Sequence, residues 1–338
     1  MLDRLLRQLD VLRDVLLQRW NCRRLPHRAI DVVDVSVRGK TFVVTGPTSG
    51  IGVTTAHALA KRGARVILAC RTVKKGEDLL AQWITESEAL RTERPNCRVM
   101  QLDLDSLESV REFAKEFVRS EGRLDVLINN AGIFDMSGSY VKTRDGREQH
   151  LQANFLAPAL LTMSLLDVLR STGAKTGDAR VVFVSSKLHE LSTGLVLDDM
   201  DFNKRPYAAA AAYGSSKLAE VMFVRALDKR LRAHAPGTRA LVLHPGNIVT
   251  GVVRTLPWII QFLYRFIMSH ILLTPDQGAR ASLYCATQQE AVSSDTNGPY
   301  LTSECVESPP SKYALDEGAT ERLWKYTLQE LDLDDSFD

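Results

Sequence analysis

Cysteine is scarce in this 338-residue chain, and its five residues include no C-x-x-C pair. An odd, scattered set of this kind is typical of reduced thiols in a cytosol-facing, intracellular protein, and it predicts neither a disulfide framework nor a metal site. An excess of one charge is also missing, because 43 basic residues face 41 acidic ones. A dedicated nucleic-acid binder needs a concentrated basic surface, so the composition argues against that class.

Long uninterrupted apolar runs are missing as well. Residues 1–20 place leucines at helical spacing, but Arg4, Asp10 and Arg13 interrupt them. The pattern predicts an amphipathic helix rather than a membrane span or a secretory signal, and its acids argue against a transit peptide. This helix could pack on its own domain or on a partner, or lie on a membrane surface such as that of the endoplasmic reticulum. Residues 1–37 are therefore predicted to be a helix and a linker.

A glycine-rich turn follows the first predicted strand, residues 40–45. Gly46, Gly50 and Gly52 lie between that strand and a helical pattern that continues to about Arg62. A strand, a glycine-rich turn and a helix form the context of a dinucleotide site. Gly46 would permit the tight turn, Gly50 would let the backbone approach a pyrophosphate, and Gly52 would allow the helix to pack close to the sheet.

The second predicted strand, residues 65–69, is followed by basic residues. An NAD site needs an acid here to bind the ribose hydroxyls, but none lies between Ala69 and Lys75. Arg71 instead offers a guanidinium that can bind a 2′-phosphate through two hydrogen bonds. The prediction is therefore NADP(H) in preference to NAD(H); the alternative is that Arg71 is a solvated loop charge.

Four more strands are predicted at 98–102, 124–128, 180–184 and 239–243. Asp103 follows the first of them, where it could accept a hydrogen bond from an adenine amino group or cap the helix that starts near Leu107. Residues 129–132, Asn-Asn-Ala-Gly, follow the second. Small residues here would let the main chain pass beneath a cofactor, and the Asn side chains could bridge neighbouring strands.

Tyr213 and Lys217 are four residues apart in a helical pattern, so they share one helix face. A lysine ammonium beside a phenol favours the phenolate, because opposite charges attract. A tyrosine in that setting can exchange a proton with an alcohol or a carbonyl near neutral pH. The pair therefore predicts acid–base chemistry on a substrate oxygen.

Four motifs in this order, at 45–52, 129–132, 213–217 and 245–246, resemble the short-chain dehydrogenase/reductase family. Within the family the chain resembles most the branch of retinol dehydrogenases and WW-domain oxidoreductases, on Cys70-Arg71 and the stretches 274–279 and 284–287, although no WW domain is present. The resemblance covers about residues 38–330. It implies an α/β fold with one Rossmann-type, doubly wound parallel sheet of about seven strands over 38–332. Residues 333–338 are predicted to be an acidic tail. One departure is Pro47, where the family usually has Ala or Gly.

The resemblance also implies roles for individual residues. Tyr213 would be the general acid/base, with Lys217 as its tuner and as a ribose ligand. Ser186, the second of a serine pair, would orient the substrate oxygen. Asn154 would hold a water beside Lys217, unless it is a polar core residue at a helix kink. The implied cofactor-binding residues are Gly46, Ser49, Gly50, Ile51, Gly52, Arg71, Asp103, Leu104, Asn130, Ala131, Gly132, Tyr213, Lys217 and Thr250.

In this family the segment at about 250–275 covers the active site. Here residues 256–273 are the most apolar stretch of the chain, broken by Arg265 and His270 and too short to predict a span. This stretch implies a lipophilic alcohol or carbonyl substrate, of the retinoid, sterol or long-chain aldehyde type, and it could contact a bilayer; the alternative is plain core packing. His189, which follows the serine pair Ser185-Ser186, could line the mouth of the substrate site or be structural.

The expected function is that of an NADP(H)-dependent oxidoreductase of CH–OH and C=O groups. The alternative is an NADP(H)-binding scaffold or regulatory protein with little turnover. An intact set of Tyr213, Lys217, Ser186 and Asn154 favours the enzyme. The helices around 147–171 and 210–234 could form a homodimer face or a solvated one, and both alternatives stay open.

Overall fold

A computed structural model describes residues 2–24, 36–135, 137–248 and 272–337 of the chain. Its centre is a seven-stranded sheet in the order β3-β2-β1-β4-β5-β6-β7, in which every neighbouring pair is parallel. The strand order reverses between β1 and β4, which is where such sheets bind ligands. The strands are β1 Thr41–Thr45, β2 Arg65–Cys70, β3 Cys97–Gln101, β4 Val126–Asn129, β5 Ala179–Val184, β6 Thr238–Leu243 and β7 Tyr300–Leu301.

The predicted doubly wound parallel sheet is confirmed, and the six strands placed from the sequence agree with the structure to within two residues at each end. The strands are nearly continuous apolar runs because both faces of the sheet are covered. Side chains alternate between the faces: in β1, Val43 joins one core, whereas Phe42 and Val44 join the other.

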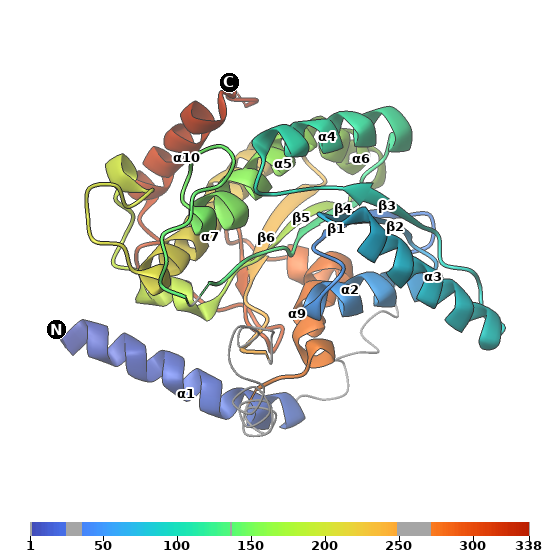
Figure 1. The fold of residues 1–338 in the computed structure, drawn as a ribbon, viewed down its shortest axis with the longest axis horizontal. Helices are drawn as coiled ribbons and strands as arrows, with labels where there is room; N and C mark the ends of the chain where they lie inside the picture. The colour runs from blue at the N-terminus through green and yellow to red at the C-terminus, as the bar shows by residue number, and fades with distance from the viewer. Residues whose placement is uncertain (1, 25–35, 136, 249–271, 338) are drawn as a thin grey trace.

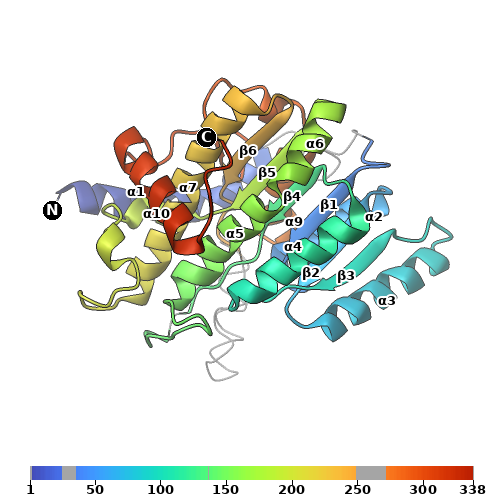
Figure 2. The same ribbon diagram turned by 90° about the horizontal axis from the view of Figure 1, so that it is seen from above.

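Helices cover both faces of the sheet, as Figures 1 and 2 show. The helices of one layer pack around the core that contains Val44. Those of the other layer pack around the core that contains Val43. The first layer comprises α2 Gly50–Lys61, α3 Val73–Ala89 and α9 Pro275–Thr287. The second comprises α4 Leu107–Glu121, the π-helical turn η1 Leu151–Leu156, α5 Ala157–Ser164, α6 Leu166–Thr176, α7 Ala209–His234 and α10 Glu317–Leu331.

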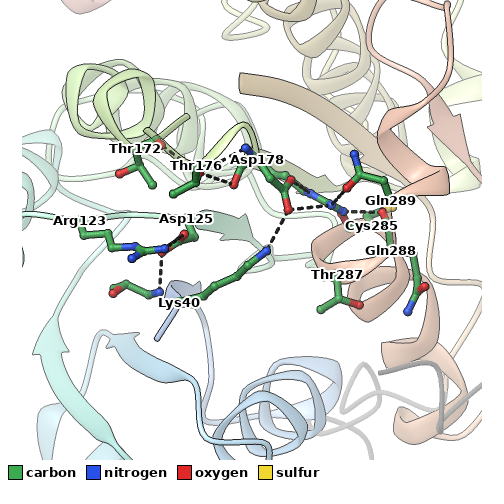
Figure 3. A network of polar contacts seen from close by, with 12 residues as sticks. Lys40, Arg123, Asp125, Thr172, Thr176, Asp178, Cys285, Thr287, Gln288 and Gln289 are labelled. Carbon is green, nitrogen blue, oxygen red and sulfur yellow. Dashed lines mark hydrogen bonds and ion pairs between the residues drawn. The ribbon is translucent and has the colours of Figure 1, made fainter. Parts of the chain in front are cut away.

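A network of charged and polar groups lies at the end of the sheet where β5 begins; Figure 3 labels Lys40, Asp178 and Gln288 in it. Arg180 is almost fully buried and donates to the carbonyls of Cys285 (2.9 Å) and Gln288 (2.6 Å), at the C-terminus of α9. Its charge suits a helix C-terminus, where carbonyl groups lack partners. Asp178 pairs with both Arg180 (2.6 Å) and Lys40 (2.9 Å), so the positive charge is compensated. This network holds α9 against the sheet, at the edge opposite the carboxyl ends of the strands.

The N-terminal helix α1 (Leu2–Arg24) packs on the rest of the chain through a polar contact. Gln18 is only 1% exposed; its amide donates to the Asn247 carbonyl (3.0 Å) and accepts from the Asn247 amide (2.7 Å). Figure 1 shows the helix below the body of the molecule. More than half of each large apolar side chain of one stripe is exposed, namely Leu9, Leu12, Leu16 and Trp20. Of the alternatives open at the sequence level, packing on its own domain is therefore observed, and it leaves an apolar stripe uncovered.

Within the described ranges, no single helix is long and apolar enough to cross a membrane. One bent pair, Leu151–Ser164 with Leu166–Thr176, passes by length and composition. Residues of this pair, among them Phe155 and Leu160, lie in the core under the sheet.

Candidate active site

The glycine-rich turn between β1 and α2 requires glycine at three positions, two for their backbone conformation and one for close packing. Gly46 and Gly50 have left-handed φ values of 65° and 54°, which glycine adopts without strain. A Cβ on Gly52 would lie 2.2 Å from the Gly46 carbonyl oxygen, so no larger residue fits there. Ser49 precedes the helix without capping it through its side chain, and the first turn of α2 contains no acid. The helix N-terminus, with its unpaired N–H groups, therefore fits a pyrophosphate.

The turn after β4 lies directly beside this one. The Asn130 side chain donates to the Thr45 carbonyl (2.9 Å), and the Thr45 hydroxyl accepts from the backbone amides of Asn130 (3.0 Å) and Ala131 (2.9 Å). Asn130 thus bridges neighbouring strands, as expected from the sequence. A Cβ on Gly132 would lie 3.3 Å from Lys217 Nζ and 3.4 Å from Asn154 Oδ1, so this glycine allows the chain to pass close to both.

Basic side chains gather beyond β2 and β3. Arg71 is exposed, and Arg144 lies 3.3 Å from Asp103. Burial and Asp103 raise the pKa of Asp105, while Arg144 and Arg71 act to lower it. Both guanidinium groups are therefore within electrostatic range of one carboxylate. Sequence reasoning missed Arg144, because it lies some seventy residues beyond Arg71 and no local pattern connects the two.

The proposed second role of Asp103, as a helix cap, is wrong. Ser106 is the N-cap residue of α4, and its hydroxyl accepts from the backbone amide of Ser109. Asp103 instead accepts from the amide of Asp105 (3.2 Å). A serine adjacent to the first helical turn reaches the open N–H groups, whereas Asp103 lies too far upstream. Leu104 follows it at the same edge, and its carbonyl accepts from Gln152 (3.3 Å).

Tyr213 and Lys217 lie on α7, as their spacing predicts. Lys217 Nζ is 5.8 Å from the centre of the Tyr213 ring and donates to the Val184 carbonyl (3.0 Å) and to Glu220 (2.7 Å). The Tyr213 ring is partly exposed and stacks on Phe134, with ring centres 4.4 Å apart. The edge of the His150 ring packs against the same tyrosine, so the phenol has a fixed orientation at the carboxyl ends of the strands.

Asn154 lies in the π-helical turn η1, which is buried throughout. Its side chain accepts from the Ile133 amide (2.7 Å) and donates to the Ile133 carbonyl (3.0 Å) and to the Ser216 hydroxyl (3.0 Å). That hydroxyl in turn donates to the Tyr213 carbonyl (2.8 Å). Asn154 therefore connects the turn after β4 to the helix that carries Tyr213. An irregular turn of this kind inside a helix is frequent at functional sites.

The two serines after β5 have different surroundings. Ser185 is buried, and its hydroxyl donates to the Lys217 carbonyl (3.0 Å). Ser186 is half-buried, and its hydroxyl accepts from the Leu188 amide (3.2 Å) at the start of the 3₁₀ turn η2, Lys187–Leu191. That bond leaves the Ser186 hydroxyl proton available for another oxygen, which the Ser185 bond does not.

His189 does not line an opening. It is completely buried; Nδ1 lies 2.8 Å from the Ser186 carbonyl, and Nε2 accepts from the Ser311 amide (3.1 Å). A carbonyl only accepts and an amide only donates, so these partners require the neutral ring with its proton on Nδ1. Burial accordingly lowers the pKa of His189 to about 4. The structural alternative therefore holds.

Thr250 and residues 256–271 lie outside the described residues. The chain on either side of them is close to the start of α2: Ile248 pairs with Leu273 in a parallel bridge, and Ile51 packs against both. The Leu273 amide also donates to the Asn247 carbonyl (2.9 Å). Residues 248 and 273 thus hold the two ends of this segment beside α2.

Comparisons with known proteins agree with this arrangement. The family profile described as short chain dehydrogenase matches residues 40–197. Dehydrogenase/reductase SDR family member FEY of Arabidopsis thaliana is 38% identical over 305 residues, which cover 87% of this chain and 79% of that protein. Retinol dehydrogenase 12 of Homo sapiens is 38% identical over 298 residues, covering 88% and 87% of the two chains. A solved structure of an uncharacterised protein from Mycobacterium paratuberculosis is 32% identical, with a TM-score of 0.67 over 94% of this chain and 98% of that one.

Proposed function

The chain belongs to the short-chain dehydrogenase/reductase family and is an oxidoreductase of CH–OH and C=O groups; we propose that it uses NADP(H) on lipophilic substrates, with Tyr213 as general acid/base. The observation that carries the proposal is the gathering of Tyr213, Lys217, Asn154 and Gly132 at the carboxyl ends of β4 and β5, beside a turn that fits a pyrophosphate. Retinol dehydrogenase 12, by its name, acts on a lipophilic alcohol, which supports the substrate class.

The cofactor would lie along the strand ends between the two turns. Gly46, Ser49, Gly50, Ile51 and Gly52 would hold its phosphates through the backbone of the α2 N-terminus. Asp103 and Leu104 would lie at the adenine end, and Asn130, Ala131 and Gly132 beneath the middle, with Thr250 at the nicotinamide end as the family implies. Bound NADP(H) would supply the hydride donor or acceptor.

The protein's own residues would manage the proton. Tyr213 would donate its phenolic proton to a carbonyl oxygen during reduction, and take it from the alcohol during oxidation. Ser186 would hold that oxygen by a hydrogen bond, and Lys217 would favour the phenolate by its charge. Asn154 would keep the turn after β4 and the helix α7 in a fixed relation.

Replacing Tyr213 by Phe tests the proton transfer. We expect wild-type turnover of NADPH with a panel of apolar aldehydes and a loss of at least about 100-fold in the variant, because acid–base catalysis is worth about 100- to 10,000-fold. Tyr326→Phe on α10, which removes a phenol outside the site, is the matched control. No turnover by the wild type on any aldehyde would favour the alternative, an NADP(H)-binding scaffold.

Preference for NADP(H) is proposed from Arg71 together with Arg144, because two guanidinium groups at the end of β2 and β3 suit a 2′-phosphate. Arg71→Ala should weaken binding of NADPH but not of NADH, measured by the cofactor's fluorescence. Lys74→Ala is the control, since Lys74 pairs with Asp78 on the surface. Equal affinity of the wild type for the two cofactors would contradict the proposal.

A peripheral membrane contact through α1 is proposed from its exposed apolar stripe. A helix with one apolar face can lie in the interface of a bilayer. Vesicle flotation should recover the wild type with the lipid, and Leu12→Ser/Leu16→Ser should stay in the aqueous fraction. A wild type that does not float would contradict this contact and leave the enzymatic proposal intact.

A further inference from the structure

A buried carboxylate adjoins the lysine of the proposed active site, and the mechanism above does not use it. Glu220 follows Lys217 by three residues on α7, so both side chains lie on one helix face. Glu220 is 2% exposed, and its Oε1 lies 2.7 Å from Lys217 Nζ. The pair is close to Tyr213, whose ring centre is 5.8 Å from the same ammonium.

The surroundings of this carboxylate leave its charge poorly compensated. Within the described part of the chain its second oxygen, Oε2, has no hydrogen-bond partner. Lys217 is the charged group that acts on it, and the Ser185 hydroxyl at the end of β5 is the other polar group beside it. Burial raises the pKa of Glu220 to about 7, although Lys217 and Ser185 act to lower it. Burial thus favours the neutral carboxyl group, whereas the Lys217 ammonium at 2.7 Å favours the carboxylate.

The same contact fixes the lysine. The Lys217 ammonium donates to the Val184 carbonyl and to Glu220, which use two of its three N–H groups. Burial alone would lower the pKa of Lys217, but the charges of Glu220 and Tyr213 raise it. The lysine is thus kept charged and in place by a partner on its own helix.

We propose, resting on the function proposed above, that Glu220 is a positioning residue of the reaction: it holds the Lys217 ammonium and partly cancels, at the Tyr213 phenol, the positive charge of that ammonium. An ammonium alone favours the phenolate, whereas a neutral ion pair does so much less. The protonated phenol is the form that donates to a carbonyl. Glu220 therefore favours reduction of the carbonyl at neutral and mildly alkaline pH.

The size of the effect follows from the helix. Tyr213 and Glu220 are seven residues apart, or about 10 Å along the axis at about 1.5 Å per residue. A unit charge at that distance shifts an ionisation by about one pH unit when the effective dielectric constant is about 20. Removing the charge should move the ionisation of the Tyr213 phenol down by that amount.

The test compares the wild type with Glu220→Gln, which keeps the shape and removes the charge. Tyrosinate absorbance is followed from pH 6 to 10.5, and the curve of a matching Tyr213→Phe protein is subtracted from each. We expect the remaining Tyr213 signal to appear about one pH unit lower in Glu220→Gln, and within a few tenths of a unit of wild type in the charge-retaining Glu220→Asp. Circular dichroism confirms folding, and Glu220→Asn replaces Glu220→Gln if the latter does not fold.

An unchanged midpoint in the neutral variants would overturn the inference, as would an equal shift in Glu220→Asp. A second reading is the pH profile of kcat for reduction, which should fall about one pH unit earlier in Glu220→Gln. The absorbance titration needs no turnover, so it separates the two proposals: a shifted midpoint in a protein without turnover supports the effect of Glu220 on the Tyr213 phenol and contradicts the enzymatic proposal. Turnover with an unshifted midpoint supports the enzymatic proposal and contradicts the effect of Glu220 on the Tyr213 phenol.

Discussion

The buried histidine of the turn η2, His189, makes the free energy of unfolding of this protein depend on pH. His189 lies between the Ser186 carbonyl and the Ser311 amide, and burial lowers its pKa from 6.5 to about 4. In the unfolded chain the ring takes up a proton near pH 6.5, whereas the folded protein excludes it until about pH 4. Below pH 6.5 the unfolded state therefore binds more protons, and the free energy of unfolding falls as the pH falls. Over about 2.5 units at 1.36 kcal/mol each, the loss is about 3 kcal/mol.

His189→Gln isolates this contribution. A glutamine amide can donate to the Ser186 carbonyl and accept from the Ser311 amide, but it takes no proton in this range. Urea unfolding at pH 8, 6.5, 5.5 and 4.5 measures the free energy of unfolding of both proteins. We expect the variant to be less stable at pH 8, because it loses the ring contact with Tyr300. The difference in the free energy of unfolding between the wild type and the variant should then change by about 3 kcal/mol in favour of the variant as the pH falls toward 4.

His234→Gln is the matched control, because His234 is exposed at the end of α7. The free energy of unfolding of the His234→Gln variant should follow that of the wild type at every pH. A gap between wild type and His189→Gln that stays constant from pH 8 to 4.5 would refute the reasoning, since it would mean that the buried ring does not resist protonation.

Two further substitutions test the contacts around the site. Gly52→Ala places a Cβ 2.2 Å from the Gly46 carbonyl oxygen, so NADPH affinity should fall by more than tenfold in a fluorescence titration. Gly318→Ala on α10 is the control and should leave the affinity unchanged. Equal NADPH affinity in both variants would contradict the tight turn. Gln18→Ala removes the hydrogen bonds between Gln18 and Asn247, at a cost of about 1–3 kcal/mol. Hydrogen exchange of the Asn247 amide should then speed up by at least about tenfold, and an unchanged rate would show that α1 does not stabilise this turn.

The periodic features of the chain were predictable from the sequence. Six strands were placed to within two residues, because their centres, such as residues 42–44, are apolar and are buried on both sheet faces. The glycine-rich turn and the Tyr213–Lys217 pair were found because each is defined by residues close together in the chain. Local spacing fixes which residues share a helix face, whatever the remainder of the fold does.

Contacts between distant segments were not predictable in the same way. Gln18 and Asn247 are 229 residues apart, and nothing in the composition of α1 indicates that a glutamine rather than a leucine faces the domain. Arg144 lies close to Asp103 only because the fold places their loops at one edge of the sheet. Asp103 was wrongly assigned as a helix cap because both Asp103 and Ser106 precede α4 and either side chain could accept from its first turn. Only the structure shows that Ser106 is adjacent to that turn.

Glu220 shows which properties of the site follow from local spacing and which depend on burial by distant segments. The sequence by itself determined that Tyr213, Lys217 and Glu220 share a face of one helix, because a helix repeats every 3.6 residues. Only the tertiary structure decided that this face is buried, that water is excluded from the carboxylate, and that the lysine turns toward it and the Val184 carbonyl. Burial by strands and helices far along the chain changes the energy of a charge, and no local spacing encodes that burial.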